Sequence, residues 1–465
     1  MRLVLPIYVG VVLVVLAGQG FAEPPIPVPP PPPPDRLPDV QTGSAPIVVP
    51  APPSAPDAAP LSGGVEVSQP LQPVGPLPKT AELDLPTPPA EPIKLPTDRN
   101  PRPGHVLGQF WDSDEFLLWW PKAQPLPPLI TGSRTGVPLL GQPQTTLIVG
   151  NRGIDNQDIA GYRGTIGYSL NDEDTVGFEG KYFFLGTRTL TTSVSDLSSD
   201  RFRSLGLPYV NAVTGQEDVL TLASPGQSSA QIAASTTTRA QGAEANVVAN
   251  LYAEPGLKLH ALVGYRFLQV NEGLLIDETY LQYPTPQFGN TKTLGLIADQ
   301  FDARNEFNGM QLGLLADAHH GMFYVELTGK VGLGINTEVV RVDGVTHLIT
   351  AANPVPILQS YPGGVYALPS NMGQVKQAVF AVVPEGIFKT GLKLGDRGRF
   401  YVGYNFLYLN NAVRAGNQVN TTINPAQIPL LNPGGTYAGP ERPEATFTRS
   451  DFWLQGLIIG FETRF

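Results

Sequence analysis

Charged residues alternate with apolar ones in several segments of this chain, and they are the side chains best suited to chemistry. Between residues 322 and 336, Glu326 and Lys330 lie on one face of an extended strand, and apolar residues lie on the other. Inside a closed sheet, a face with both signs of charge either lines a water path or forms internal ion pairs. The residues that we predict to face such a lumen are Glu179, Lys181, Glu244, Lys258, Arg266, Glu326, Lys330, Glu385, Lys389, Glu462 and Arg464.

A metal site is the first alternative for the ionisable residues. Asp317, His319 and His320 are close in the sequence, but they occupy a predicted tight turn and lack a further clear ligand. The acidic run at 171–174 lacks the spacing and the glycine of a calcium loop, and it is typical of a turn. The chain also has no cysteine. We therefore expect no metal and no cofactor.

A catalytic site is the second alternative. The sequence has no phosphate-binding glycine loop, no nucleophile elbow and no HExxH pattern. Asp299, Asp302 and Glu306 would lie near a barrel rim, where an enzyme site could be built, but solvated carboxylates at strand ends explain them equally well. The formal net charge of -10 and the lack of a Lys/Arg cluster argue against nucleic acid as a partner. We expect neither an enzyme nor a nucleic-acid-binding protein.

The elements that must position these charges are β-strands. We identify about ten segments of roughly 9 to 15 residues with period-two alternation, which is the length that a tilted strand needs to cross a bilayer. Charged residues make up only 15% of the chain, below the usual value of about 25%. A soluble β-sandwich shares the alternation but has shorter strands. The clearest segments are 175–185, 242–252, 257–269, 322–336 and 400–410.

The connections between these strands alternate in length, which favours a membrane barrel over a sandwich. Short turns follow Ser169, Tyr252, Asp317 and Leu394. A membrane barrel has short turns at one end, long loops at the other and an even strand number. The sequence therefore predicts an all-β fold over 106–465, a transmembrane antiparallel β-barrel of about ten strands. The long connections are roughly 121–161, 186–241, 271–304, 342–378 and 411–449.

Three features leave the strand count between ten and twelve. Pro384 falls inside the eighth predicted strand, although proline is disfavoured in a fully paired strand. Apolar segments at 145–149 and 345–350 lie within the predicted long loops and could form a further pair of strands. Either even number leaves both ends of the barrel chain on the same side of the membrane.

The first 105 residues lack the composition of a folded domain. Residues 1–22 have a positive charge at Arg2, an apolar stretch and a small-x-small cleavage site, so we predict a signal peptide; an uncleaved anchor is the alternative. The prolines are concentrated in residues 23–105, which we predict to be a disordered proline-rich linker in the periplasm. This arm is expected to act as a spacer, with a tether to the cell wall or to a proline-recognising partner as the alternative.

Several stretches of the folded part resemble a known family. "EFLLWWPKAQPLPPLIT", "GYRGTIGYSLNDEDTVGFEGKYFFLG", "LVGYRFLQVNEGLLI" and the C-terminal strand look like the BBP7 family of porin-like outer-membrane β-barrels, over about residues 110–465. The resemblance implies outer-membrane lipid as the surroundings, and it transfers no catalytic motif. The closing "GFETRF" resembles the C-terminal signal that barrel-assembly machinery recognises, with Phe461 and Phe465 as its aromatic residues.

These observations lead to two expectations about function in the outer membrane of a Gram-negative-type envelope. The first is a porin-like passive channel for small hydrophilic solutes or ions. The alternative is a closed structural barrel that anchors the envelope through its proline-rich arm and displays surface loops for adhesion or recognition. Barrels of about 8 strands are filled by their own side chains, whereas 16 to 18 strands leave an open channel. Ten strands lie near the filled end of this range.

Overall fold

The structure of the protein is a computed structural model, and the strands that it contains begin at Phe110. It describes residues 110–151, 153, 158–170, 175–196, 202–286, 291–352, 355–395, 397–435 and 438–465. The predicted signal peptide at 1–22 and the predicted disordered linker at 23–105 lie outside the described residues. Both therefore stay predictions.

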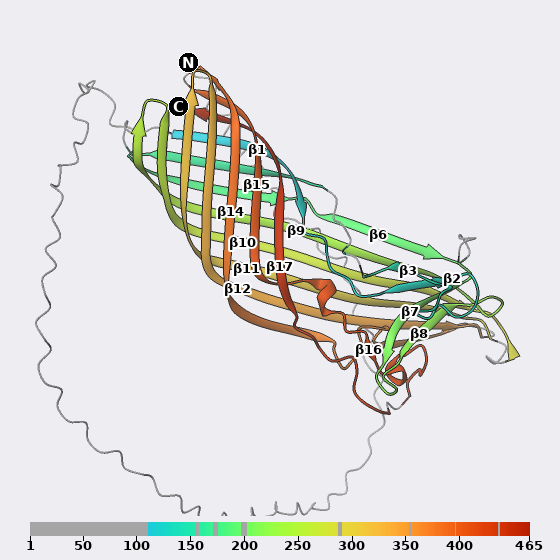
Figure 1. The fold of residues 1–465 in the computed structure, drawn as a ribbon. Helices are drawn as coiled ribbons and strands as arrows, with labels where there is room; N and C mark the ends of the chain where they lie inside the picture. Colours follow the sequence, from blue (N-terminus) through green and yellow to red (C-terminus); the bar gives the residue numbers. More distant parts are fainter. Residues whose placement is uncertain are drawn as a thin grey trace, which may run out of the picture. The chain divides into compact units, whose positions relative to one another are not determined.

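Ten antiparallel strands form a closed ring (Figure 1). Each strand pairs with the next one around the ring, and the first strand pairs with the last, from Trp111 opposite Arg464 to Pro121 opposite Leu454. The prediction of a ten-stranded barrel is confirmed. In order around the ring, the strands are β1 (Phe110–Pro121), β4 (Ile159–Ser169), β5 (Val176–Leu185), β9 (Ser228–Glu254), β10 (Leu257–Gln282), β11 (Thr293–His320), β12 (Phe323–Thr350), β14 (Gly373–Leu394), β15 (Gly398–Val413) and β17 (Arg449–Arg464).

The option of two further ring strands is wrong. The segment at 145–149 forms β3 (Thr145–Val149), which belongs to a separate sheet, and the segment at 345–350 is the end of β12. Both segments are strands, as their composition indicates, but neither adds a member to the ring. The sheet that a strand joins depends on its pairing partners, which the composition of the segment does not encode.

The outward face of the ring is apolar near the short turns. On β12 the outward side chains from Phe323 to Ile335 are 42% to 64% exposed, as expected for a surface that lipid covers. We call this surface the membrane belt, and the two ends of the barrel the turn end and the loop end. Exposed members of the belt include Phe116, Ile166, Phe178, Val247, Val263, Tyr265, Met310, Leu312, Leu314, Val325, Leu327, Val331, Leu333, Ile335, Phe388, Val402, Tyr404, Leu457, Ile459 and Phe461.

The polarity of the two faces reverses beyond the membrane belt. On β11 the outward side chains are apolar from Ala318 to Met310, and polar from Asn308 to Gln300. The inward face changes in the opposite sense. Beyond the belt it carries large apolar side chains such as Phe307 and Phe301, which are fully buried. At the turn end the strand is thus apolar on the outside, as in a membrane barrel. At the loop end it is apolar on the inside, as in a water-soluble protein.

This reversal corrects the predicted strand lengths. Instead of 9 to 15 residues, β9, β10, β11 and β12 have 27, 26, 28 and 28 residues. Parts of the connections predicted at 186–241, 271–304 and 342–378 are therefore strand rather than loop. Polar and apolar residues still alternate in these parts, but the apolar residues now face inward. A search for strands whose outward face is apolar therefore stops at the membrane boundary.

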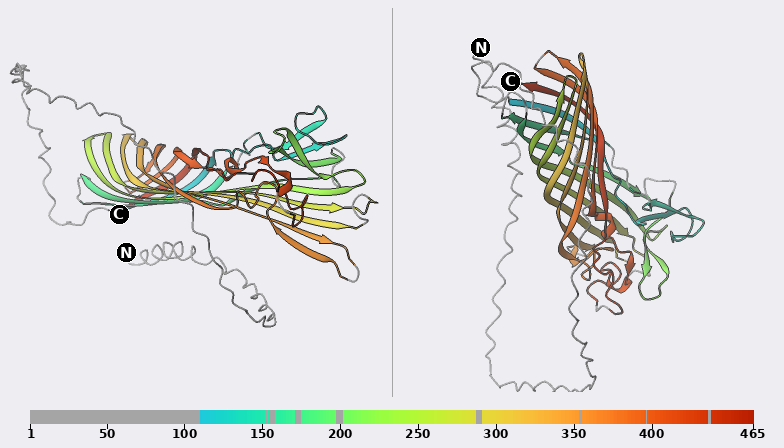
Figure 2. Two further views of the ribbon diagram at one scale, coloured as in Figure 1. Left: turned by 90° about the horizontal axis from the view of Figure 1, so that it is seen from below. Right: turned by 60° about the vertical axis from the view of Figure 1, so that its left-hand side comes forward.

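A second sheet covers the inner face of the extended strands at the loop end (Figure 2). Its buried side chains share one core with Ile232, Ile276 and Phe301 of the ring strands. The sheet consists of β2 (Ile130–Ser133), β3, β7 (Ser204–Asn211), β8 (Glu217–Ala223) and β16 (Thr422–Ile423). Two short strands extend the ring sheet itself, β6 (Arg188–Ser195) on β9 and β13 (Ile357–Pro362) on β12.

Two short 3-10 helices, η2 (Ala415–Gln418) and η3 (Pro425–Gln427), lie in the segment between β15 and β17. Within the described part of the chain, no helix has the length and hydropathy that crossing a membrane requires.

Pro384 marks a break in one wall of the ring. It lies inside β14 and faces β12 in register, but the ladder between β14 and β15 begins only at Glu385. Proline has no N–H to donate, so it tolerates a position where pairing stops. Beyond it, the backbone N–H of Val382 donates to the side chain of Asn410 at 2.6 Å, and Asn411 adopts a φ of 47°. Beyond this point β14 stays paired with β12 as far as Gly373, and β15 stays paired with β17 as far as Val413, so the two strands part from each other.

The reversal of polarity makes a testable prediction about β11. An Arg at the lipid-facing position of Leu314 should reduce the free energy of unfolding by about 2 to 4 kcal/mol, because the charge would enter hydrocarbon. The matched control is Gln300→Arg, on the same face beyond the belt, which should change it by less than about 0.5 kcal/mol. Urea unfolding in lipid vesicles measures both. Equal losses would contradict the assigned boundary.

Candidate functional site: the charged interior

The strand register places opposite charges directly across from each other inside the ring. Facing pairs are Glu115 and Arg163 between β1 and β4, and Lys330 and Glu385 between β12 and β14. Directly opposed charges of opposite sign stabilise a sheet. The same arrangement occurs at Glu244 and Arg266, Glu244 and Lys181, Glu326 and Lys389, Lys258 and Asp317, and Arg399 and Glu462.

The charges at mid-height form one connected group, which we call the ion-pair layer. Lys330 Nζ lies 2.7 Å from Glu244 Oε1 and 2.7 Å from Glu385 Oε2. Because Glu244 is on β9 and Lys330 is on β12, this contact crosses the interior rather than following one ladder. Arg266 also contacts Glu385, at 2.8 Å. The members of the layer are Glu115, Arg163, Glu179, Lys181, Glu244, Arg266, Glu326, Lys330, Glu385 and Lys389.

Further contacts extend the layer across the opposite wall. Arg163 forms an ion pair with Glu115 and donates to the amide oxygen of Asn405 on β15 at 3.0 Å. The Tyr401 hydroxyl donates to Glu115 at 2.7 Å, and its ring lies 4.8 Å from the Lys389 ammonium. The layer contains equal numbers of acidic and basic side chains. This balance is what burial of so many charges requires.

Burial shows that the layer fills the barrel at this height. The side chains of Arg266 and Lys330 are each 1% exposed, and that of Glu385 is 2% exposed. A side chain beside a water-filled path would be accessible to water along that path. The interior is therefore closed where these three residues meet.

A second closure lies beyond the ion-pair layer, toward the loop end. The guanidinium of Arg414 makes a bidentate pair with Glu272, at 2.5 Å and 2.7 Å, and both side chains are fully buried. Arg414 also donates to the carbonyl oxygen of Lys122 at 3.0 Å and lies 5.1 Å from the ring of Phe452. This pair fixes the segment that follows β15 against the inner face of β10.

Glu272 and Arg414 are not among the predicted lumen residues, because both lie in predicted long loops. One signal was available for Glu272. It continues the inward row of Val270 and Leu274, where a lone carboxylate in an apolar row needs a cationic partner. No comparable pattern surrounds Arg414, which is in an irregular segment. Its role depends on a fold that brings two distant parts of the chain together.

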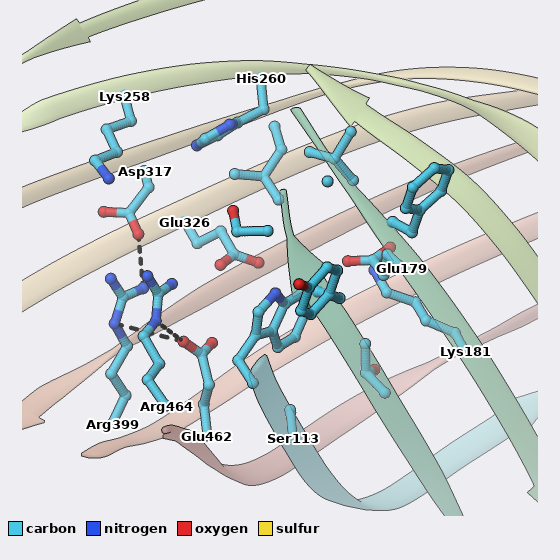
Figure 3. A pocket seen from close by; sticks show the side chains of 18 of the residues that line it. Ser113, Glu179, Lys181, Lys258, His260, Asp317, Glu326, Arg399, Glu462 and Arg464 are labelled. Atoms are coloured by element: carbon cyan, nitrogen blue, oxygen red, sulfur yellow. Dashed lines mark hydrogen bonds and ion pairs between the residues drawn. The ribbon is translucent and has the colours of Figure 1, made fainter. Parts of the chain in front are cut away.

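The turn end holds a charged cavity of about 120 Å³ (Figure 3). Of the predicted lumen residues, Lys258, Glu462 and Arg464 lie here rather than in the ion-pair layer. Arg399 contacts Asp317 at 2.7 Å, and Arg464 contacts Glu462 at 2.9 Å. The cavity gives the barrel interior a polar entrance at the turn end, below the closed layer. Passage of a solute through the predicted lumen residues stays a prediction.

The alternative chemistries of the sequence analysis do not assemble in the part of the chain that the structure describes. Among the described residues, no group of three His, Cys, Asp or Glu side chains could hold a metal ion. Asp317 lies 3.9 Å from His319 Nδ1, but its closer pair is with Arg399 at 2.7 Å. The acidic run at 171–174 lies outside the described residues. On β11, Asp302 and Glu306 are on the outward face, whereas Asp299 is buried on the inward face. The rim carboxylates therefore do not converge on a common point.

The two aromatic residues of the predicted assembly signal are exposed, Phe461 on the outward face of β17 and Phe465 directly after the strand. Phe461 is 45% exposed and Phe465 is 64% exposed. The backbone N–H of Phe465 donates to the carbonyl oxygen of Phe110 at 2.9 Å, and the two rings are 6.2 Å apart. These contacts hold the end of the chain at the closing seam of the ring. Recognition by assembly machinery stays a prediction.

Comparison with known proteins identifies a family. Residues 111–465 match the family model described as "Putative beta barrel porin-7 (BBP7)". No curated protein matches the sequence. Among solved structures, the outer membrane protease OmpT from Escherichia coli is similar at 10% identity and a TM-score of 0.37, with 77% of this chain and 97% of that chain covered.

Two further solved structures have lower scores. The P. putida toluene transporter TodX has 8% identity and a TM-score of 0.18, with 78% of this chain and 91% of that chain covered. A Pseudomonas aeruginosa FadL homologue has 6% identity and a TM-score of 0.19, with 77% of this chain and 90% of that chain covered.

Removal of one charge from the ion-pair layer tests its energetic role. Glu385→Gln should reduce the free energy of unfolding by about 3 to 5 kcal/mol, because it leaves buried cations without their shared partner. The control is Glu306→Gln, which breaks an exposed pair with Arg304 on the outer face and should cost less than about 1 kcal/mol. Urea unfolding followed by tryptophan fluorescence measures both. A loss at Glu385 no larger than the control would contradict the layer's role.

Proposed function

This chain belongs to the BBP7 family of outer-membrane β-barrels, and on that premise we propose that it is a closed barrel which anchors a loop-end domain in the outer membrane and displays it. The observation that carries this proposal is the ion-pair layer, in which Lys330 joins Glu244 and Glu385 across a buried interior. A barrel filled in this way is a rigid support. We also propose that the protein is not an enzyme.

The extended strands supply the display platform. At about 3.3 Å per residue, the part of β11 beyond Met310 continues for roughly 55 Å along the strand. The second sheet packs on these extensions through a shared apolar core, so the platform is held rigidly to the membrane-spanning part. Exposed apolar residues on its surface, such as Val213, Ile357 and Leu358, offer contacts for adhesion or recognition.

The proposed orientation follows from the two kinds of connection. In outer-membrane barrels the short turns face the periplasm and the long connections face outside. We therefore place the turn end in the periplasm, together with the arm at 23–105, which would link the barrel to the cell wall. Export through the segment at 1–22 and assembly through Phe461 and Phe465 are parts of the same proposal.

A passive channel for small hydrophilic solutes or ions is the second candidate. The family description favours it, and so does the charged cavity at the turn end, which would collect polar solutes. For a solute to pass, both the ion-pair layer and the contact between Arg414 and Glu272 would have to open. The two candidates differ in one observable, which is the flow of ions through the inserted protein.

Display at the cell surface can be tested with an epitope tag. A tag inserted between Thr214 and Gly215, in the turn between β7 and β8, should bind antibody on intact cells. A tag between Glu254 and Pro255, in the turn between β9 and β10, is the matched control and should bind only after the outer membrane is permeabilised. The opposite pattern would overturn the orientation, and no surface signal from either tag would overturn display.

A further inference from the structure

An inward loop lies at the loop end, in the connection between the ring strands β12 and β14. Between β13 and β14, the side chains of Val365, Tyr366, Ala367 and Leu368 are all fully buried. The Tyr366 hydroxyl donates to the carbonyl oxygen of Pro208 on β7 at 3.0 Å. This loop, residues 363–368, thus joins the extended ring strands to the second sheet.

One carboxylate holds this loop in place. Asp299 on β11 accepts hydrogen bonds from the backbone N–H groups of Val365, Tyr366 and Ala367, at distances from 2.8 to 3.1 Å. A side chain at Gly364 would approach Asp299 Oδ1 to 2.2 Å, so glycine is required for this contact. The loop therefore forms a nest of donors around a single buried acidic group.

A second carboxyl group lies next to this contact and has no partner. Glu278 on β10 is 2% exposed, and neither of its oxygens has a hydrogen-bond partner within the described part of the chain. Its neighbours across the two ladders are Ile232 and Ile297, which offer no donor. A buried carboxylate without a partner is costly, so the group is stable here only with its proton.

The electrostatic surroundings act in the same direction, and all of these groups lie beyond the membrane belt. Burial raises the pKa of Glu278 well above its usual range, and the nearby charges of Asp299 and Asp277 add to this. Burial also raises the pKa of Asp299 to about 6, although the three backbone donors oppose the change. The pKa of Tyr366 is raised by burial first and by the two acids next.

We propose that Glu278 makes the inward loop 363–368 a proton-dependent latch, which holds at acid pH and loosens as the pH rises. The inference concerns the closure of the loop-end domain, and it does not depend on what that domain binds. In a released loop the carboxyl group of Glu278 would meet water and regain its ordinary affinity for protons. The closed form binds protons more tightly than this open form, so protons favour closure.

The direction of the effect follows from the raised values. The closing contribution of Glu278 is complete below the ordinary pKa of a glutamate carboxyl group, and it is lost as the pH rises through the raised pKa in the closed form. The window of this loss begins at 4.5 and extends upward.

Hydrogen exchange of the backbone amides at 365–367 measures the latch directly. In the whole folded protein, protection corrected for intrinsic exchange should fall between pH 5 and pH 8, by at most about tenfold per pH unit for each proton released. Glu278→Gln should stay protected at pH 8 and show a weaker pH dependence. The matched control is Glu306→Gln, which removes a carboxylate from the outward face of β11 and should keep the wild-type dependence. Amides of β12 in the membrane belt serve as an internal reference.

Three results would overturn the latch. The first is protection of the amides at 365–367 that stays constant or rises between pH 5 and pH 8. This result needs only the wild-type protein. The second is a Glu278→Gln variant whose protection depends on pH as strongly as that of the wild type, which would exclude Glu278 as the titrating group. A parallel loss of protection in the β12 reference amides would show general unfolding in place of a local opening.

Discussion

The absence of water inside a lipid bilayer is the constraint that shapes the whole barrel. Every backbone polar group in the membrane must be paired within the protein, and a closed ring of strands achieves this without a free edge. The pairing of β1 with β17 completes the ring. The same constraint applies to the interior. Its charges meet opposite charges through the strand register, as at Lys330 and Glu385, so that little access to water remains.

The reversal of polarity along the strands follows from the same constraint, applied at the membrane boundary. On β11, Leu312 and Leu314 face lipid, whereas Asp302 and Arg304 face water on the same side of the strand. Beyond the boundary the inward face turns apolar and gathers a core of its own with the second sheet. A single set of long strands therefore serves as a membrane barrel at the turn end and as one layer of a water-soluble sandwich at the loop end.

The sequence alone predicts the ring and the face that carries charge, because period-two alternation and the lengths of the turns report directly on them. Lys330 and Glu326 could be placed on one face of one strand in this way. The identity of their partners could not, since a partner depends on register between strands that are far apart in sequence. Glu272 and Arg414 are 142 residues apart and meet only in the folded chain. Glu278 escaped notice because its strand exchanges polarity before it, and Asp299 was considered only as one of the rim carboxylates.

The ion-pair layer closes the interior, and a measurement of ion flow tests this closure. The folded full-length protein, inserted into a planar lipid bilayer between concentrated salt solutions, should give no discrete current steps, because Arg266, Lys330 and Glu385 leave no water path beside them. Recovery of folded protein from the same membrane would verify insertion. Regular steps whose size scales with salt concentration would contradict the closure and would establish the passive channel in its place.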